Sequence, residues 1–468
     1  MTFISTRLRS LYTPPLQWLR NTCRRISAFA DAHHTALIWC FGILYKFALD
    51  ALYLWAASPL YAYGGLIHHA NAFKYAIASV CYFLLFAAIP KREGDSTAFL
   101  MHLQFAYTVA PMLTFYSLAN GSNRYILMVF LCILLECWLV FRPTTHTKTI
   151  SVTGIRSYAT VALGILVLFT LLIPLLYNGF EGLKAFDLNY IYVMRKNAEY
   201  PPGFGYIFNW VAKAILPFAY LFCLCREKYP RAAFLALLQV LLYMETGHKS
   251  VLLILFPLTL IFFAAKCGHL LKLMYLGLAL VSLLTVFAYQ LDRPFYDPGA
   301  PIYDRLGVLA AFLFAARALF IPASIKFMFY DCFSQYPKVF FSDGLIGKML
   351  GLTYPYKMAN GFIVDAYFGE PLGTSQANTG YLGEAYAQLG FLGLLLMSAL
   401  LGLILRALSG YHRKETFPMI AALFSIYIIV LNDGALFTTL FTGGMLIAFL
   451  LVFIYLGKLE DSHGIQRI

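Results

Sequence analysis

The chain of 468 residues is 61% hydrophobic and only 12% charged, whereas a soluble domain is about 45–50% apolar and about 25% charged. Such a chain cannot cover itself with polar surface, which excludes a soluble enzyme, a disordered protein and a single-pass receptor. The net charge of +13 is spread through short segments between apolar runs. It therefore indicates topology determinants and a candidate anion site rather than a nucleic-acid partner. The composition predicts an all-α polytopic membrane protein.

Residues 1–35 form the first predicted segment, in which five arginines are interspersed with aromatic side chains. No cleavable signal peptide is recognised in this segment. Arginines among aromatic residues are typical of a segment that lies on a membrane surface, because the cations meet the headgroups while the rings enter the interface. The sequence predicts a cytoplasmic, basic and amphipathic N-terminus.

Apolar runs further along the chain predict about twelve membrane-spanning helices, since a helix needs about 20 apolar residues to cross about 30 Å of hydrocarbon. With the N-terminus inside, each connection expected in the cytoplasm holds at least two basic residues, as the positive-inside rule requires. This arrangement predicts about nine spans within 36–289, further spans within 379–457, and a cytoplasmic tail at 458–468. The predicted spans lie near 36–58, 75–89, 97–118, 125–141, 157–177, 207–224, 231–246, 250–266, 271–289, 379–405, 417–432 and 436–457.

One further apolar stretch, 306–329, is long enough to cross but contains Arg317, Pro322 and Lys326. Counting it as a span would move the basic residues of 406–414 to the outside, against the positive-inside rule. We therefore expect a helix that lies on the outer face or re-enters from it. The longest connection, 290–378, then becomes a large, partly helical periplasmic loop between the ninth and tenth spans, where function is most expected.

Ionisable residues within the predicted spans are candidates for function, because a charge in the membrane is costly. Lys46 and Asp50 are four residues apart and share one face of the first span. We expect them to form a structural ion pair. Glu136, in the fourth span, is expected to be a hydrogen-bonded structural residue.

The polar segment 245–250 interrupts a long apolar run and contains His248 and Lys249. It does not match a phosphate-binding P-loop, because the earlier glycine and the preceding strand are both missing. A short hairpin that brings a lysine and a helix N-terminus to one point can bind an anion. The alternative is a polar cap of a hairpin that lies among headgroups.

The external segment 290–378 holds seven basic and seven acidic residues, so any anion must be bound by particular cations. Arg317 is the strongest candidate, because it lies among apolar residues and a guanidinium can hold two phosphate oxygens. The structural alternative is a buried pair with Asp331 or Glu384. Arg293, Arg305 and Lys326 are further candidates for substrate binding.

A polar stretch leads directly into the tenth predicted span and carries Asn378, Thr379, Tyr381, Glu384 and Tyr386. Glu384 enters the membrane in the first turn of the helix, where the helix dipole favours a carboxylate. It is also a suitable general base or hydroxyl-binding group. The tyrosines fit either sugar stacking or an aromatic belt at the membrane interface.

These residues carry a resemblance to a known family. The segments resemble motifs of the Wzy-type O-antigen polymerases, which join oligosaccharide repeat units, and the similarity covers roughly 230–405. The first half of the chain is similar only in hydropathy and helix number. The matching segments are Thr246-Gly-His-Lys-Ser250, Arg317-Ala-Leu-Phe-Ile-Pro-Ala323, Phe329-Tyr330-Asp331, Asn378-Thr-Gly-Tyr-Leu-Gly-Glu-Ala-Tyr386 and Gly390-Phe-Leu-Gly393.

The resemblance implies an inner-membrane glycosyltransferase of GT-C-like fold that takes lipid-linked oligosaccharides as both donor and acceptor. The donor would be a glycan on undecaprenyl pyrophosphate, and the reaction would occur on the periplasmic face without a metal or other cofactor. Partners would be membrane lipids, a chain-length regulator protein and a flippase.

Fixed cations aimed at the leaving pyrophosphate are the most useful device for such a reaction. Arg317 is the first choice for this role, followed by Lys249 and Arg305, whereas Glu384 or His248 would orient or deprotonate the acceptor. Tyr330 and Asp331 complete the expected substrate contacts, together with the other external cations and the polar stretch at 378–386. Two alternatives remain, an O-antigen ligase-type transferase and a transporter or flippase for lipid-linked oligosaccharides.

Overall fold

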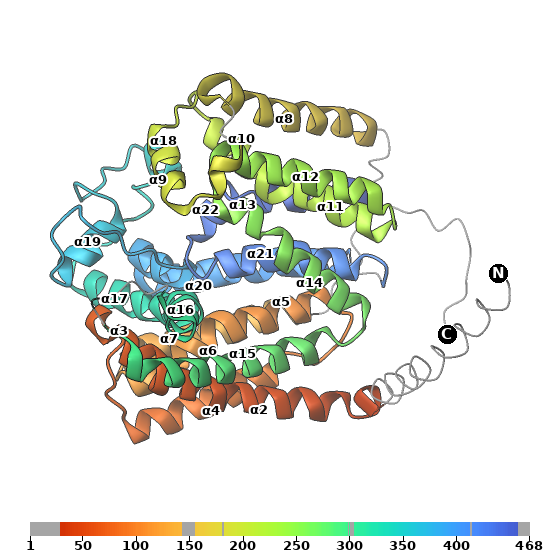
Figure 1. The fold of residues 1–468 in the computed structure, drawn as a ribbon. Coiled ribbons are helices and arrows are strands. Elements are labelled where there is room, and N and C mark those ends of the chain that lie inside the picture. The colour runs from red at the N-terminus through yellow and green to blue at the C-terminus, as the bar shows by residue number, and fades with distance from the viewer. Residues whose placement is uncertain are drawn as a thin grey trace.

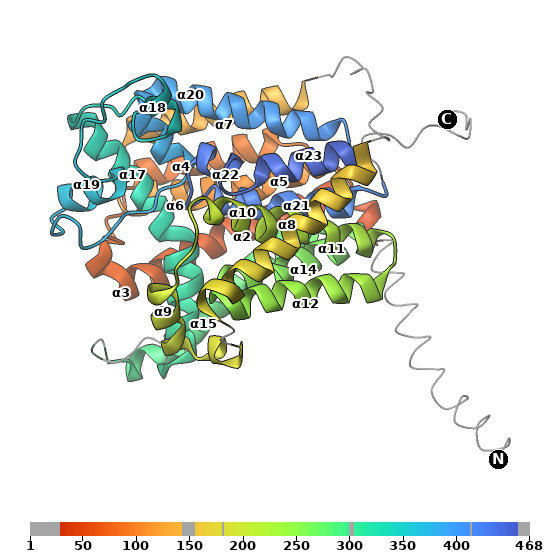
Figure 2. The same ribbon diagram turned by 90° about the horizontal axis from the view of Figure 1, so that it is seen from above.

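The computed structural model describes residues 29–142, 155–179, 182–297, 299, 304–411 and 414–456. Most of the predicted cytoplasmic segment 1–35 and the whole predicted tail 458–468 lie outside the described residues. Throughout the described ranges the secondary structure is helical, without a strand. Figures 1 and 2 show long helices that lie side by side, with shorter helices and loops gathered at one end of the bundle.

Helices long and apolar enough to cross a membrane number nine within the described ranges. Three shorter apolar helices, α4 (Ala72–Ala88), α21 (Phe417–Val430) and α23 (Met445–Leu456), accompany them. Eleven of the twelve predicted spanning segments each coincide with one continuous helix, whereas 436–457 is divided between two short helices, α22 (Leu436–Leu440) and α23. The chain is therefore a multi-pass helical membrane protein. The nine candidates are His34–Gly64, Ser96–Leu118, Asn123–Phe141, Ile155–Asn178, Phe204–Cys225, Lys249–Lys266, Leu270–Phe295, Leu306–Gln335 and Tyr381–Ser409.

Several of these long helices are continuous in space but consist of more than one element. In the first half of the chain the elements are α2 (His34–Leu52), η1 (Tyr53–Ala57), α3 (Ser58–Tyr61), η2 (Ala62–Gly64), α4, α5 (Ser96–Gln104), η3 (Phe105–Val109), α6 (Ala110–Leu118), α7 (Asn123–Phe141) and α8 (Ile155–Asn178). The middle of the chain forms η4 (Gly182–Phe186), α9 (Leu188–Asn197), α10 (Phe204–Trp210), η5 (Val211–Ile215), α11 (Leu216–Cys225), α12 (Tyr229–Thr246), α13 (Lys249–Leu253), α14 (Leu255–Lys266) and α15 (Leu270–Asp292). The last part forms η6 (Arg293–Phe295), α16 (Leu306–Ala310), η8 (Ala311–Phe320), α17 (Ile321–Gln335), α18 (Leu345–Met349), α19 (Asn360–Tyr367), α20 (Tyr381–Ser409), α21, α22 (Leu436–Leu440) and α23.

Prolines explain why four of the long helices contain a π-helical segment. A proline inside a helix lacks an N–H group, and its ring clashes with the carbonyl four residues earlier. In each of the four cases the π-helical segment ends two residues before a proline, so the wider turn accommodates the ring without breaking the helix. The prolines and their segments are Pro59 after η1, Pro111 after η3, Pro217 after η5 and Pro322 after η8.

The helix Leu306–Gln335, formed by α16, η8 and α17, runs across the ends of the other helices rather than along them (Figures 1 and 2). We refer to it as the crosswise helix. Gly307 allows its close approach to α15, because a Cβ at this position would overlap the Ala288 carbonyl oxygen. The Gly307 N–H donates to Asp292 Oδ2 at 2.6 Å. By length and apolarity alone this helix qualifies as a span, but its direction is that of a helix lying on one end of the bundle.

Two of the ionisable groups predicted within the spans form hydrogen bonds inside the bundle. Lys46 Nζ donates to Asp50 Oδ1 at 2.7 Å, and the same carboxylate accepts hydroxyl groups of Tyr75 and Thr114. This confirms the predicted ion pair, in which both oxygens of the Asp50 carboxylate accept hydrogen bonds. Glu136 is completely buried and accepts Gln104 Nε2 at 3.0 Å, as expected for a hydrogen-bonded structural residue.

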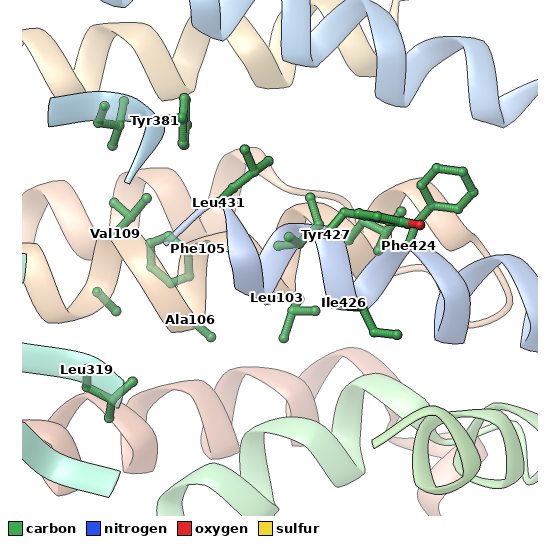
Figure 3. Packing of buried hydrophobic residues seen from close by; sticks show 14 of the residues in the cluster. Leu103, Phe105, Ala106, Val109, Leu319, Tyr381, Phe424, Ile426, Tyr427 and Leu431 are labelled. Atoms are coloured by element: carbon green, nitrogen blue, oxygen red, sulfur yellow. The ribbon is translucent and has the colours of Figure 1, made fainter. Parts of the chain in front are cut away.

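Tyr381 was predicted to contact substrate, but it belongs to the core. Its side chain is only 1% exposed, and its hydroxyl accepts Gln104 Nε2 at 2.6 Å. Figure 3 shows Tyr381 facing Val109, Phe105 and Leu431 among the buried apolar residues. The first turn of α20 is thus anchored to the middle of the bundle, which fixes the start of this helix.

Candidate functional site

Most of the sequence-predicted residues belong to three groups, and the elements that carry these groups meet at the end of the bundle where the crosswise helix lies (Figure 1). The first group surrounds the turn 431–434 between α21 and α22, which we call the Asn432 turn. The second is a carboxylate network at the start of α20. The third surrounds the hairpin 245–250 between α12 and α13.

The crosswise helix holds the Asn432 turn in place. Lys326 is fully buried, and its Nζ donates to Asn432 O at 2.7 Å, to Asn432 Oδ1 at 3.0 Å and to Pro322 O at 3.0 Å. Asn432 Nδ2 in turn donates to Ala318 O at 3.1 Å. Lys326 was predicted to bind substrate. Because all three of its donors are used inside the protein, the structure assigns it to support of this turn instead.

Helix α20 supports the Asn432 turn from another side. The Tyr381 N–H donates to Leu431 O at 3.1 Å. Gly380 lies so close to the turn that a Cβ there would overlap the carbonyl oxygens of Asn432 and Leu431. Leu431 and Asn432 are each only 1% exposed. Two elements besides α21 therefore fix the backbone of this turn.

The tip of the Asn432 turn presents an unengaged carboxylate. The side chain of Asp433 reaches solvent and has no hydrogen bond or salt bridge within the described ranges. The surrounding protein raises the pKa of the Asp433 carboxyl by limiting its hydration, while the charges of Lys326 and Arg317 lower it. Sequence reasoning did not identify Asp433, because nothing in the local sequence indicates that the turn after α21 faces the crosswise helix.

Arg317 is the cation near the Asn432 turn that remains available to bind an anion. It lies in the π-helical part of the crosswise helix, a feature that often occurs at functional sites. Its side chain is exposed and has no hydrogen bond or salt bridge among the described residues. The alternative of a buried pair with Asp331 or Glu384 is therefore not formed.

The carboxylate network joins Glu384 to a residue far away in the sequence. Gln388 Nε2 donates to Glu384 Oε1 at 2.7 Å and to Asp343 Oδ1 at 3.1 Å. Asn360 Nδ2 donates to Glu384 Oε1 at 3.0 Å and to Asp343 Oδ2 at 2.9 Å. Two amides thus hold two carboxylates together, and Tyr354 OH donates to Asn360 Oδ1 at 2.8 Å.

Sequence reasoning found only Glu384 in this network. The spacing of four residues between Glu384 and Gln388 places both on one helix face, and this was a usable signal. Asp343 and Asn360 lie in the long loop, whose path no local pattern reveals. Burial, followed by the negative charges of Asp343 and Glu384, raises the pKa of Tyr354, so its hydroxyl acts as a donor to the network.

The predicted aromatic contacts pack mainly on one another. The rings of Tyr330 and Tyr386 lie 4.9 Å apart, and the ring of Tyr125 lies 4.9 Å from that of Tyr330. Lys338 Nζ lies 4.4 Å from the centre of the Tyr386 ring. Tyr386 is only 6% exposed. This residue, predicted to stack on a sugar, therefore belongs to an aromatic cluster that supports α20 and α17.

The remaining predicted contacts differ in exposure. Asn378 and Asp331 are exposed, whereas Thr379 is buried beside Gly383. The prediction that Thr379 contacts substrate is therefore not supported. Arg305 is exposed with its guanidinium 5.5 Å from the Phe295 ring centre, and Arg293 lies in η6 at the end of α15. Both arginines lie where the chain passes from α15 towards the crosswise helix.

The hairpin 245–250 is covered by α9. A Cβ at Gly247, which has a φ of +64°, would lie 2.7 Å from Met194 Cε. His248 packs on Phe208 with 5.1 Å between ring centroids. Burial, followed by the charges of Arg195 and Lys213, lowers the pKa of His248 to about 4. The histidine is therefore neutral at neutral pH.

The cations near the hairpin come from separate elements. Lys249 is the first residue of α13, which has only five residues, so the helix dipole contributes little there. Arg195 of α9 and Lys213 of η5 place further positive charge near His248, and neither was identified from the sequence. Lysine and arginine side chains thus place positive charge near the hairpin, whereas the N-terminus of α13 contributes little to it.

No protein-family model, curated protein or solved structure matches the chain. In the part of the chain that the structure describes, no three or more His, Cys, Asp or Glu side chains are grouped as metal ligands would be. The functional argument therefore rests on the three groups of residues.

Proposed function

We propose that the protein is an inner-membrane polymerase that joins oligosaccharide repeat units carried on undecaprenyl pyrophosphate. The observation that carries this proposal is Arg317. Its guanidinium is exposed, has no hydrogen bond or salt bridge in the part of the chain that the structure describes, and lies on a helix across the end of an apolar bundle. Such a group is suited to a lipid-linked anion, whose phosphates lie at the membrane surface. The resemblance of the surrounding segments to Wzy-type polymerases supports the same function.

The proposed topology has twelve spans in a GT-C-like arrangement, with both termini in the cytoplasm and 290–378 in the periplasm. The distribution of basic residues supports it. They lie in the last turn of, or soon after, the helices α4, α7, α11, α14 and α20, at the ends that lie opposite the crosswise helix in Figure 1, as the positive-inside rule requires of a cytoplasmic face. These residues are Lys91, Arg142, Arg226, Lys266 and Arg406.

In the proposed reaction, a hydroxyl of the incoming lipid-linked repeat unit attacks the anomeric carbon of the donor glycan. A bond forms between that oxygen and the anomeric carbon, and the bond to the pyrophosphate oxygen breaks. Undecaprenyl pyrophosphate leaves with additional negative charge. Arg317 would stabilise this charge, because a cation that is already in position needs no reorganisation during the reaction.

The proposal is tested with the purified full-length protein in lipid nanodiscs, supplied with undecaprenyl-pyrophosphate-linked repeat units. We expect a ladder of longer glycans on a gel and release of undecaprenyl pyrophosphate. Transfer only when lipid A core is added would instead indicate an O-antigen ligase. Movement of the intact lipid across liposomes without bond formation would indicate a flippase. Either of these two outcomes contradicts the polymerase function.

A further inference from the structure

We propose that Asp433 is the catalytic base that accepts the proton of the acceptor hydroxyl, and that Lys326 is the residue that positions it. This inference rests on the proposed polymerase function and deepens it by assigning the acceptor side of the reaction. Two observations carry the inference. The backbone that carries Asp433 is held by several hydrogen bonds, whereas the Asp433 carboxylate has no hydrogen bond or salt bridge within the described ranges.

The support of the Asn432 turn is more extensive than a connecting turn requires. A fully buried lysine uses all three of its donors on the turn and the adjoining carbonyl of Pro322. The side chain of Asn432 bonds back to Ala318 O, and Gly380 leaves no space for movement of the Asn432 carbonyl. A reactive group must be held within about 0.5 Å of its working position. These contacts restrict movement of the backbone that carries Asp433.

The carboxylate of Asp433 is free to receive a substrate hydroxyl. Glu384, the sequence-predicted base, is part-buried, and its Oε1 already accepts both Gln388 Nε2 and Asn360 Nδ2. Asp433 makes no such bond within the described ranges and reaches solvent. Of these two carboxylates, Asp433 is the one open to a substrate hydroxyl, whereas Glu384 organises the loop above α20.

The charges around Asp433 suit both halves of the reaction. The groups that face it electrostatically are Lys326 and Arg317 from the crosswise helix, and the hydroxyl of Tyr107 from η3. The acceptor oxygen forms its bond to the anomeric carbon while its proton passes to Asp433, and from there to water. The electron pair of the broken bond leaves with the pyrophosphate beside Arg317. Base and anion-binding group are thus close without neutralising each other in a salt bridge.

The test compares Asp433→Asn with the matched variant Glu384→Gln in the purified full-length protein. We expect Asp433→Asn to lower kcat on the order of 10²-fold or more, as for loss of a general base. Its melting temperature and its affinity for undecaprenyl pyrophosphate should stay at wild-type values, because the side chain has no hydrogen bond or salt bridge within the described ranges. Asp433→Glu should retain part of the activity. Glu384→Gln should lower the melting temperature, and its effect on kcat should be smaller than that of Asp433→Asn.

The pH profile separates a base from a structural residue. In the wild type, kcat should fall as pH decreases and Asp433 becomes protonated, and this acidic limb should disappear in the residual activity of Asp433→Asn. Lys326→Met should move the limb to higher pH, because removal of a nearby positive charge raises the pKa of Asp433. Wild-type turnover in Asp433→Asn would overturn this inference. Absence of polymerisation by the wild type would instead refute the proposed function.

Discussion

At the scale of single residues, variants of Arg317 distinguish a catalytic role of this cation from a structural one. Arg317→Ala should lower turnover on the order of 10²-fold, comparable to loss of one donor that stabilises a transition-state anion. Its melting temperature should stay at the wild-type value, since no protein carboxylate is left unpaired. Lysine should rescue poorly because it lacks the planar fork. Turnover assays beside thermal unfolding check this prediction, and retained activity in both variants contradicts it.

Lys46 should behave in the opposite way. Lys46→Met leaves Asp50 as a buried carboxylate without its cation, which costs on the order of 3–5 kcal/mol. The hydroxyl bonds of Tyr75 and Thr114 to Asp50 reduce that cost. We expect a lower melting temperature and normal turnover in the folded fraction. The double variant Lys46→Met/Asp50→Leu should recover most of the stability; failure to recover would argue against a purely structural pair.

His248 gives a pH dependence of stability. Its pKa in the folded protein is lowered to about 4, below the ordinary value of about 6.5. The unfolded chain therefore binds a proton first as pH falls. The stability associated with a neutral His248 is complete above about pH 6.5 and is lost as pH falls towards 4. Apparent melting temperatures of the wild type and His248→Gln should converge over this range, and parallel curves would contradict the prediction.

At the scale of elements, the crosswise helix depends on its contact with α15. Gly307→Ala places a Cβ against the Ala288 carbonyl, and overpacking of this kind costs about 1–3 kcal/mol. We expect it to displace the helix that carries Arg317 and Lys326, and so to lower both turnover and melting temperature. Gly277→Ala in α15 is the control, since nothing lies within 4 Å of a Cβ there. An equal effect of the two substitutions would contradict this account.

The π-helical segments show how far local sequence determines an element. Prolines at 59, 111, 217 and 322 lie within apolar runs, and each long helix continues through its proline by widening the preceding turn. A sequence rule that ends helices at proline would have divided these elements. In a membrane an interrupted backbone leaves polar groups unsatisfied, which favours continuation.

At the scale of the whole molecule, the proposed topology can be tested by labelling with a membrane-impermeant thiol reagent. Single cysteines at Thr374 and Lys414, both exposed, should be labelled from opposite sides of the membrane in a background without the native cysteines. Labelling of both positions from the same side would place the crosswise helix and its arginine differently and remove the basis of the proposed function.

The sequence by itself determined the helical membrane class, the position of each long helix, and the pairing of Lys46 with Asp50. These follow from composition, from run length and from a spacing of four residues, all of which are local properties. Arg317 and Glu384 could be selected as candidates because a charge next to apolar residues can be recognised from the sequence alone.

Only the tertiary structure decided what each candidate contacts. Lys326 became a buried support, Tyr381 and Tyr386 became core residues, and Asp433 emerged as an exposed carboxylate beside Arg317. The direction of the crosswise helix was also fixed by packing against α15 and the Asn432 turn. The contact of Lys326 with Asn432 joins residues 106 positions apart in the chain. No periodicity along the chain encodes which distant carbonyl a buried amine will meet, because that choice depends on how all the helices pack together.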